Sequence, residues 1–174
     1  LPFLPLTATQ VLLTNFLSDM PLMAITSDSV DPEHVATPQR WRVADVQRFM
    51  LVFGLISSTF DLASFAMLRW LFGADPAAFQ TSWFVISVLT ELAAVLVLRT
   101  RRVAWSSRPG SWIIWLSLLV AVATLAAPWI PWVAGQLGFE TPHGGLLIGI
   151  FVIVVAYAAA TEAAKAGFYR RRKA

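Results

Sequence analysis

Apolar residues are concentrated in five long stretches of the chain, and polar segments separate these stretches. They cover about residues 4–25, 49–72, 83–98, 112–130 and 146–166. An α-helix needs about 20 residues to cross roughly 30 Å of hydrocarbon, and all five stretches reach or approach that length. The pattern therefore predicts an all-α membrane protein, a bundle of about five transmembrane helices.

The composition agrees with a membrane protein and excludes several kinds of chemistry. The 174 residues are 57% hydrophobic and only 13% charged, whereas soluble domains have about 25% charged residues. The absence of cysteine excludes disulfides, thiolate metal sites and cysteine nucleophiles. The sequence also lacks a glycine-rich phosphate loop, a zinc-protease motif and a nucleophile elbow, so it shows no machinery for covalent catalysis.

The basic residues predict how the helices are oriented. Segments 26–48 and 99–111 contain several arginines and the C-terminal tail is also basic, whereas segments 73–81 and 131–145 contain neither Lys nor Arg. The positive-inside rule places the basic segments in the cytoplasm, so we expect the N-terminus outside and the C-terminus in the cytoplasm. Arg69 is the exception, and it can extend from a helix end to the membrane surface. A basic tail beside a membrane helix indicates contact with anionic lipid rather than with nucleic acid.

The first apolar stretch contains the polar residues that most strongly indicate a function. Asn15 and Asp19 are four residues apart, so a helix places them on one face, with Ser18 beside them. Pro21 removes the donor that would bond the carbonyl of Leu17, and we expect the helix to kink or unwind there. Carboxylate, amide, hydroxyl and carbonyl oxygens suit a hard cation such as Mg²⁺, Ca²⁺, Na⁺ or H⁺. The alternative is a polar face that only packs against neighbouring helices.

Two more acids lie inside predicted membrane helices. Glu91, near the middle of the third stretch, either supplies a second carboxylate to the cation or is protonated and bonded to a neighbouring helix. Asp61 has small hydroxylic neighbours, which favours a structural hydrogen bond over ion binding. Glu162 and Lys165, three residues apart at the end of the last stretch, are expected to form an interfacial ion pair.

Residues 12–19 resemble the sixth transmembrane helix of P-type cation-transporting ATPases. In that family an Asn and an Asp four residues later bind the transported cation. The resemblance therefore implies that Asn15 and Asp19 are metal ligands, with Ser18 as a further candidate. Several motifs in order extend the resemblance to the magnesium-transporting branch over essentially the whole chain, at residues 28–31, 37–41, 48–50, 57–61, 79–84 and 98–102.

Glu91 departs from the magnesium-transporting pattern, in which this position is often an amide. An acid there resembles the eighth helix of calcium pumps, where a Glu binds the ion. The resemblance thus implies a fourth metal ligand at Glu91, and it leaves open a pump for calcium or another cation.

The resemblance also implies what surrounds this chain. Residues 1–174 would be helices six to ten of a ten-helix membrane domain in the cell membrane, and the first residue is not Met, as in a segment from inside a longer protein. The phosphorylated Asp-Lys-Thr-Gly-Thr motif, the actuator and the nucleotide-binding domain are absent from it. We therefore expect no ATP hydrolysis by this chain alone. Mg²⁺ and ATP would serve the missing catalytic domains, and the expected partners are lipid, a transported divalent cation and the rest of the pump. A separate small transporter or regulatory subunit, or a scaffold whose acids only pack, are the alternatives.

Overall fold

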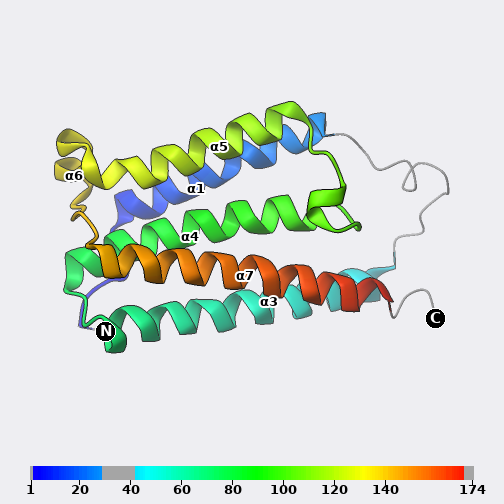
Figure 1. Cartoon of the computed structure of the whole chain (residues 1–174), viewed down its shortest axis with the longest axis horizontal. Helices are drawn as coiled ribbons and strands as arrows, with labels where there is room; N and C mark the ends of the chain where they lie inside the picture. The colour runs from blue at the N-terminus through cyan, green and yellow to red at the C-terminus, as the bar shows by residue number, and fades with distance from the viewer. Residues whose placement is uncertain (1, 29–41, 171–174) are drawn as a thin grey trace.

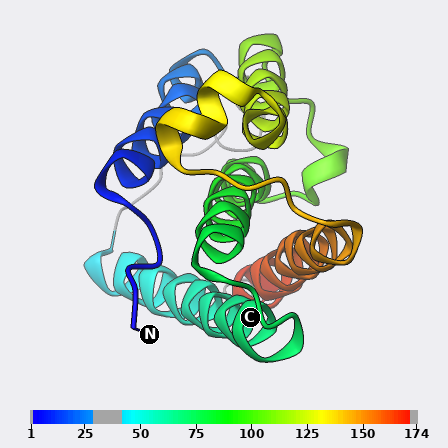
Figure 2. The ribbon, with the colours of Figure 1, turned by 90° about the vertical axis from the view of Figure 1, so that its left-hand side faces the viewer.

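The described part of the protein is entirely helical. The structure is a computed structural model that describes residues 2–28 and 42–170. Its long helices lie side by side along one direction (Figure 1) and are α1 (Ala8–Ala24), α3 (Val43–Ala66), α4 (Pro76–Leu98), α5 (Ser111–Ala126) and α7 (Gly144–Arg170). α4 occupies the middle of the bundle when it is viewed from its end (Figure 2). The expectation of an all-α membrane bundle is confirmed.

Four of these helices are long and apolar enough to cross a membrane. They are Val43–Leu71, in which α3 continues as the π-helix Met67–Leu71, then Pro76–Leu98, Ser111–Trp129 and Gly144–Arg170. α1 is shorter, with 17 residues, and spans about 25 Å at 1.5 Å per residue. It packs against α4 and α5 inside the same bundle, and a short 3₁₀ turn, Ile25–Ser27, follows it.

The helix ends follow local sequence signals. Thr7 and Gln10 form a capping box at the start of α1, because each side chain bonds the backbone N–H of the other. Asp75 accepts a hydrogen bond from Ala78 N at the start of α4, where Pro76 occupies the first helical position. Gly138, with φ 66°, ends the short helix α6 (Pro131–Leu137), since a left-handed residue closes a helix most easily when it is glycine.

The core is built around α4, and polar contacts fix the loops to it at one end. Phe79 and Phe84 of α4 are fully buried. Thr81 Oγ1 accepts a hydrogen bond of 2.9 Å from the backbone N–H of Glu140, and the side-chain amide of Gln10 donates to Leu137 O at 2.8 Å. Buried polar groups must be paired in this way, so these two contacts set where the segment after α5 lies.

Of the expected kink or unwinding at Pro21, the unwinding is wrong, because α1 is continuous beside Asp19. The helix continues past the proline to Ala24. Proline removes only its own N–H, and therefore Leu17 O loses its intrahelical partner while the following turn remains helical. Pro21 is buried among the neighbouring helices, which hold the turn in place.

The expected ion pair between Glu162 and Lys165 is confirmed, with 2.9 Å between Lys165 Nζ and Glu162 Oε2. Lys165 is 1% exposed, and its ammonium also donates to Val97 O at 2.8 Å. Val97 lies in the last turn of α4, where carbonyls have no partner within the helix. The lysine therefore also caps α4 from α7.

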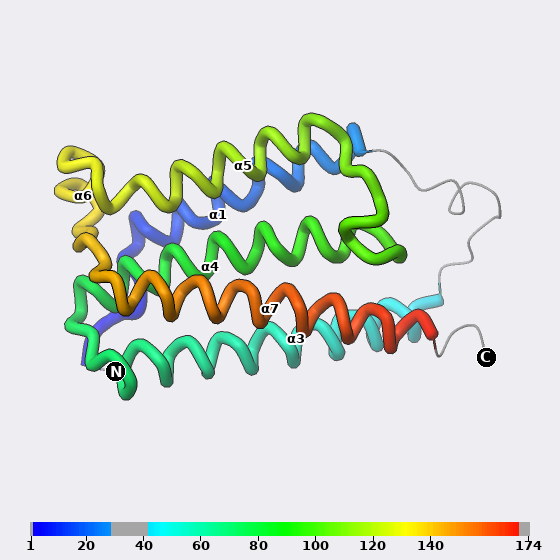
Figure 3. Tube along the Cα trace, viewed as in Figure 1, coloured from blue at the N-terminus to red at the C-terminus, as the bar shows by residue number. Residues whose placement is uncertain are grey.

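The described basic residues gather at one end of the bundle. This end contains the start of α3, the end of α4, the 99–110 loop and the end of α7 (Figure 1). Arg101 lies over the ring of Tyr169, 5.3 Å from its centroid, and so joins the loop to α7. Arg69, near the end of the π-helix, lies at the opposite end. The described chain starts at this opposite end and finishes at the basic one (Figure 3). Residues 29–41 and 171–174, which contain the remaining basic residues of the loop and tail, lie outside the described residues.

Candidate functional site

The polar residues of α1 lie where the sequence pattern predicts, on one side of a helix. Asn15 and Asp19 are one turn apart and both are exposed in this chain. Ser18 is half-buried because it faces α4. Because Asn15 and Asp19 are exposed, their amide and carboxylate groups lie outside the core of this bundle.

Ser18 joins α1 to the second predicted acid. Its hydroxyl donates a hydrogen bond to the Glu91 carboxylate on α4, 73 residues away in the sequence. The structure thus brings Ser18 and Glu91 together, while Asp19 follows Ser18 on α1 and Asn15 lies one turn away along the same helix. A hydroxyl oxygen beside a carboxylate, with a second acid next to it in the chain, is a set of oxygen donors that suits a hard cation.

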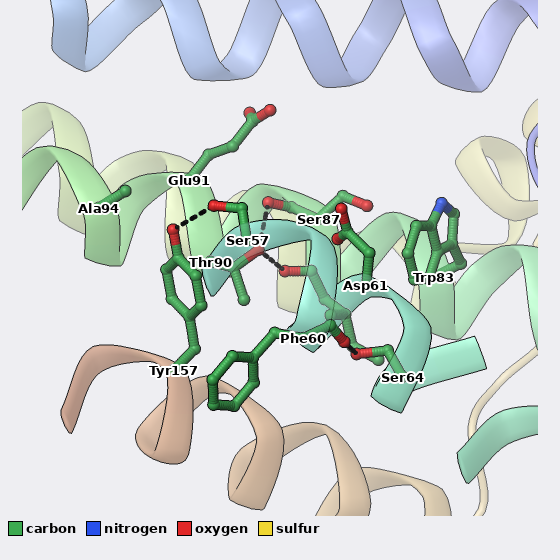
Figure 4. A pocket seen from close by; sticks show the side chains of 11 residues that line it. Ser57, Phe60, Asp61, Ser64, Trp83, Ser87, Thr90, Glu91, Ala94 and Tyr157 are labelled. Atoms are coloured by element: carbon green, nitrogen blue, oxygen red, sulfur yellow. Dashed lines mark hydrogen bonds between the residues drawn. The ribbon is translucent and has the colours of Figure 1, made fainter. Parts of the chain in front are cut away.

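A cavity of about 340 Å³ lies beside Glu91, and polar groups from three helices line it (Figure 4). The Glu91 side chain extends from this lining toward α1, in agreement with its hydrogen bond from Ser18 (Figure 4). The lining residues come from α3, α4 and α7, and they are Ser57, Phe60, Asp61, Ser64, Trp83, Ile86, Ser87, Thr90, Glu91, Ala94 and Tyr157.

Asp61 does not make the structural hydrogen bond that its neighbours suggested. The hydroxyl of Ser57 is 3.0 Å from the Tyr157 hydroxyl. Those of Ser64 and Thr59 donate to backbone carbonyls one turn earlier on α3, each at 2.8 Å. Within residues 2–28 and 42–170, no hydrogen bond or ion pair reaches the Asp61 carboxylate, and this side chain is exposed. The carboxylate instead faces the cavity.

Ser87, Thr90 and Tyr157 also line this cavity, and none of them was a predicted site residue. Trp83, Ser87, Thr90 and Glu91 follow one another at spacings of four, three and one, which places them on one face of a helix. That stripe was visible in the sequence. The presence of Tyr157 in the lining could not be predicted from the sequence, because it depends on how α7 packs against α3.

The described residues can hold only part of a metal site. Among residues 2–28 and 42–170, no group of three or more His, Cys, Asp or Glu side chains could hold a metal ion. The donors present are carboxylate, hydroxyl and amide oxygens, which are the ligands that Mg²⁺ and Ca²⁺ prefer. Mg²⁺ is commonly bound through one or two carboxylates and keeps several waters. The donor set fits such an ion when water and further protein groups complete the shell.

Comparison with known proteins identifies the family. The family model described as "Cation transporting ATPase, C-terminus" matches residues 3–167. The magnesium-transporting ATPase, P-type 1, of Salmonella typhimurium strain LT2 is 37% identical over 177 residues, and the match covers 99% of this chain and 19% of the relative. The protein of the same name from Escherichia coli strain K12 is 36% identical, and the match covers 99% of this chain and 20% of that relative.

The chain therefore spans about one fifth of the length of these curated relatives. With four apolar helices long enough to cross a bilayer, it is a multi-pass membrane protein. The resemblance to P-type pumps that the residues suggested is confirmed, and the chain belongs to the family of cation-transporting ATPases, within which it matches the C-terminal region.

Proposed function

We propose that this chain is the C-terminal part of the membrane domain of an ATP-driven magnesium pump in the cell membrane. In this proposal Asn15, Ser18, Asp19 and Glu91 supply part of the intramembrane ion site. The hydrogen bond from Ser18 to Glu91 carries the proposal, because it holds the acid of α4 beside the acid of α1. The two relatives named above are magnesium-transporting ATPases, and the high coverage of this chain supports the same cargo.

The bilayer gives these acids a reason to bind a cation. A charged side chain near the bilayer centre costs several kcal/mol on insertion scales unless it is paired or serves an ion. Asp19 on α1 and Glu91 on α4 are both acids, and two ionised carboxylates near each other repel. A divalent cation between them neutralises both. The exposed side of Asn15 and Asp19 would then face helices from the rest of the pump, which complete the site.

A calcium pump is the second candidate, and one observation favours it. Glu91 is an acid whose carboxylate lies at the site, and Ca²⁺ takes six to eight oxygen ligands, several of them carboxylates. The two relatives named above are magnesium-transporting ATPases, and each match covers 99% of this chain. We therefore place magnesium first.

The cargo can be tested with the full-length pump in cells that lack their own magnesium transporters. We expect the pump to restore growth at low magnesium and to drive accumulation of isotopically enriched Mg²⁺, measured by mass spectrometry of washed cells. A tenfold excess of Ca²⁺ should leave this accumulation largely unchanged. Accumulation of Ca²⁺ with none of Mg²⁺ would contradict the magnesium assignment, and transport of neither ion would contradict the pump.

The orientation gives a separate prediction, which uses the absence of cysteine from this chain. A Cβ added at Gly135 on α6 would have open space around it, and Ser106 is exposed in the 99–110 loop. In a full-length pump with its other cysteines replaced, we expect a membrane-impermeant maleimide to label Gly135→Cys in intact cells. Ser106→Cys should be labelled only after permeabilisation. The reverse pattern would show that the C-terminus lies outside.

A further inference from the structure

Polar contacts join the segment that contains α1 to α4 at three levels along the bundle, in the part of the chain that the structure describes. α1 and α4 run parallel (Figure 3), so both partners advance along the chain from one level to the next. We call these contacts the α1–α4 ladder, since together they define which residue of α4 lies beside each residue of α1. The pairs are Leu4 with Gln80, Ser18 with Glu91, and Asp28 with Arg99.

We propose that the ion pair of Arg99 with Asp28 positions the ion site. It holds α1 at the register on α4 that places Ser18 beside Glu91. Arg99 is then a positioning residue for transport and not an ion ligand. This inference rests on the proposed function, because it concerns how the same contact between α1 and α4 is held in place.

Apolar packing defines this register less sharply than the ladder does. Leu13, Leu17 and Met20 of α1 pack against the core, to which α4 contributes Phe84 and Val88. Hydrophobic attraction is non-directional and depends on the area that is buried. A hydrogen bond is more demanding, since its donor and acceptor must lie within about 3.2 Å. The polar contacts therefore determine where α1 stops along α4.

The pair of Arg99 with Asp28 is the most buried level of the ladder. Its two side chains are 2% and 11% exposed, whereas Leu4 and Glu91 of the other levels are exposed. Charges attract more strongly where water is excluded. Asp28 is also held from a third side, because Gly110 N donates to its carboxylate at 2.7 Å.

Helical backbone connects this pair to the ion site on both sides. Arg99 is the C-terminal cap of α4 and comes eight residues after Glu91, a distance of about 12 Å at 1.5 Å per residue. On the other side, α1 passes directly into the 3₁₀ turn Ile25–Ser27, and the N–H of Asp28 closes this turn with a hydrogen bond of 3.1 Å. A shift of Asp28 along the bundle would therefore move Ser18 with it.

The ion site should be sensitive to such a shift. Mg²⁺ requires near-octahedral geometry, with ligand oxygens at about 2.0–2.1 Å. A slip of α1 by one residue would move its donors by about 1.5 Å along α4, which is too far for the same set of bonds. Loss of the ion pair should therefore weaken binding of the ion while the transport cycle itself continues.

The test measures the Mg²⁺ concentration that half-saturates uptake by the full-length pump, with isotopically enriched Mg²⁺ and correction for the amount of pump in the membrane. Arg99→Met should raise this concentration by at least about tenfold, which corresponds to about 1.4 kcal/mol. The maximal rate per pump should stay close to that of the unchanged protein. Arg99→Lys keeps a positive charge near Asp28 and should recover part of the affinity.

Lys165→Met is the matched control. Lys165 is also a buried cation at the basic end, and it donates to Val97 O in the last turn of α4. It comes from α7, however, and its ion pair is with Glu162 of the same helix. We expect Lys165→Met to lower the amount of folded pump, as Arg99→Met does, without changing the half-saturating concentration.

A double variant separates positioning from stability. Arg99→Met combined with Asp28→Leu leaves no uncompensated charge and should recover part of the stability. The ladder is still broken at this level, so the half-saturating concentration should stay raised. If affinity recovers together with stability, Arg99 acts only through stability and the inference is overturned.

Asp19→Asn distinguishes a failure of this inference from a failure of the proposed function. If Asp19→Asn raises the half-saturating concentration while Arg99→Met behaves as Lys165→Met does, the ion site stands and the positioning role is refuted. If Asp19→Asn leaves the concentration unchanged, the proposed ion site fails and the positioning role fails with it. If Arg99→Met does not reach the membrane, the double variant decides.

Discussion

Asp19→Asn in the full-length pump should reduce the apparent affinity for the transported cation by roughly 100-fold or more. A unit charge and a second unit charge 4 Å apart attract by about 4 kcal/mol at an effective dielectric constant of 20, and about 1.4 kcal/mol is a factor of ten. Asparagine keeps the size and one oxygen of aspartate but removes the charge. Isotopic Mg²⁺ uptake against external concentration measures the effect.

The control for Asp19→Asn must separate ion binding from folding. Glu140→Gln removes an exposed acid in the 138–143 loop, and we expect unchanged uptake. The amount of pump in the membrane should be similar for both variants, since Asp19 is exposed in this bundle and makes no contact that holds the core. A scaffold in which the acids only pack predicts the opposite result, with intact uptake in Asp19→Asn and a change only in expression.

The helical pattern predicted the shared face of Asn15 and Asp19 on α1, because one local rule determines it. Asn15 and Asp19 share a face in any regular helix, whatever surrounds them. The hydrogen bond from Ser18 to Glu91 could not be predicted in the same way. It depends on how α1 and α4 are placed along each other, and side-chain packing and the loops between the two helices determine that placement.

Two expectations from local sequence, at Pro21 and at Asp61, differ from the structure. Proline was expected to kink or unwind α1, yet the helix does not unwind, because the missing N–H affects one carbonyl and Pro21 is buried within the helix. The hydroxyls around Asp61 were expected to bond it, yet serine and threonine in a helix readily donate to the carbonyl one turn earlier, as Ser64 and Thr59 do. Near Asp61, backbone carbonyls and not the carboxylate accept the hydrogen bonds of these two hydroxyls.

Arg99→Met should cause the largest loss of stability, because Arg99 and Asp28 form a buried ion pair at the basic end of the bundle. Arg99 Nη1 is 3.0 Å from Asp28 Oδ2, and the two side chains are 2% and 11% exposed. Arg99 Nη2 also donates to Ser107 O at 2.5 Å, and Gly110 N donates to Asp28 Oδ1 at 2.7 Å. These contacts join the end of α4, the loop before α5 and the segment that follows α1. The backbone of Gly110 lies close to that segment, since a Cβ at Gly110 would be 2.9 Å from Ser27 O.

Methionine fills much of the volume of Arg99 but removes the guanidinium that pairs with the Asp28 carboxylate. Removing one partner of a buried pair costs about 3–5 kcal/mol, since the other charge stays away from water. We expect this loss in the free energy of unfolding of the detergent-solubilised pump, measured by denaturant titration of tryptophan fluorescence. Arg108→Met, at an exposed arginine of the same loop, should change it by less than about 1 kcal/mol. Arg99→Met combined with Asp28→Leu should recover part of the loss, because no uncompensated charge then remains. Equal stability in Arg99→Met and Arg108→Met would mean that the pair does not hold this end of the bundle together.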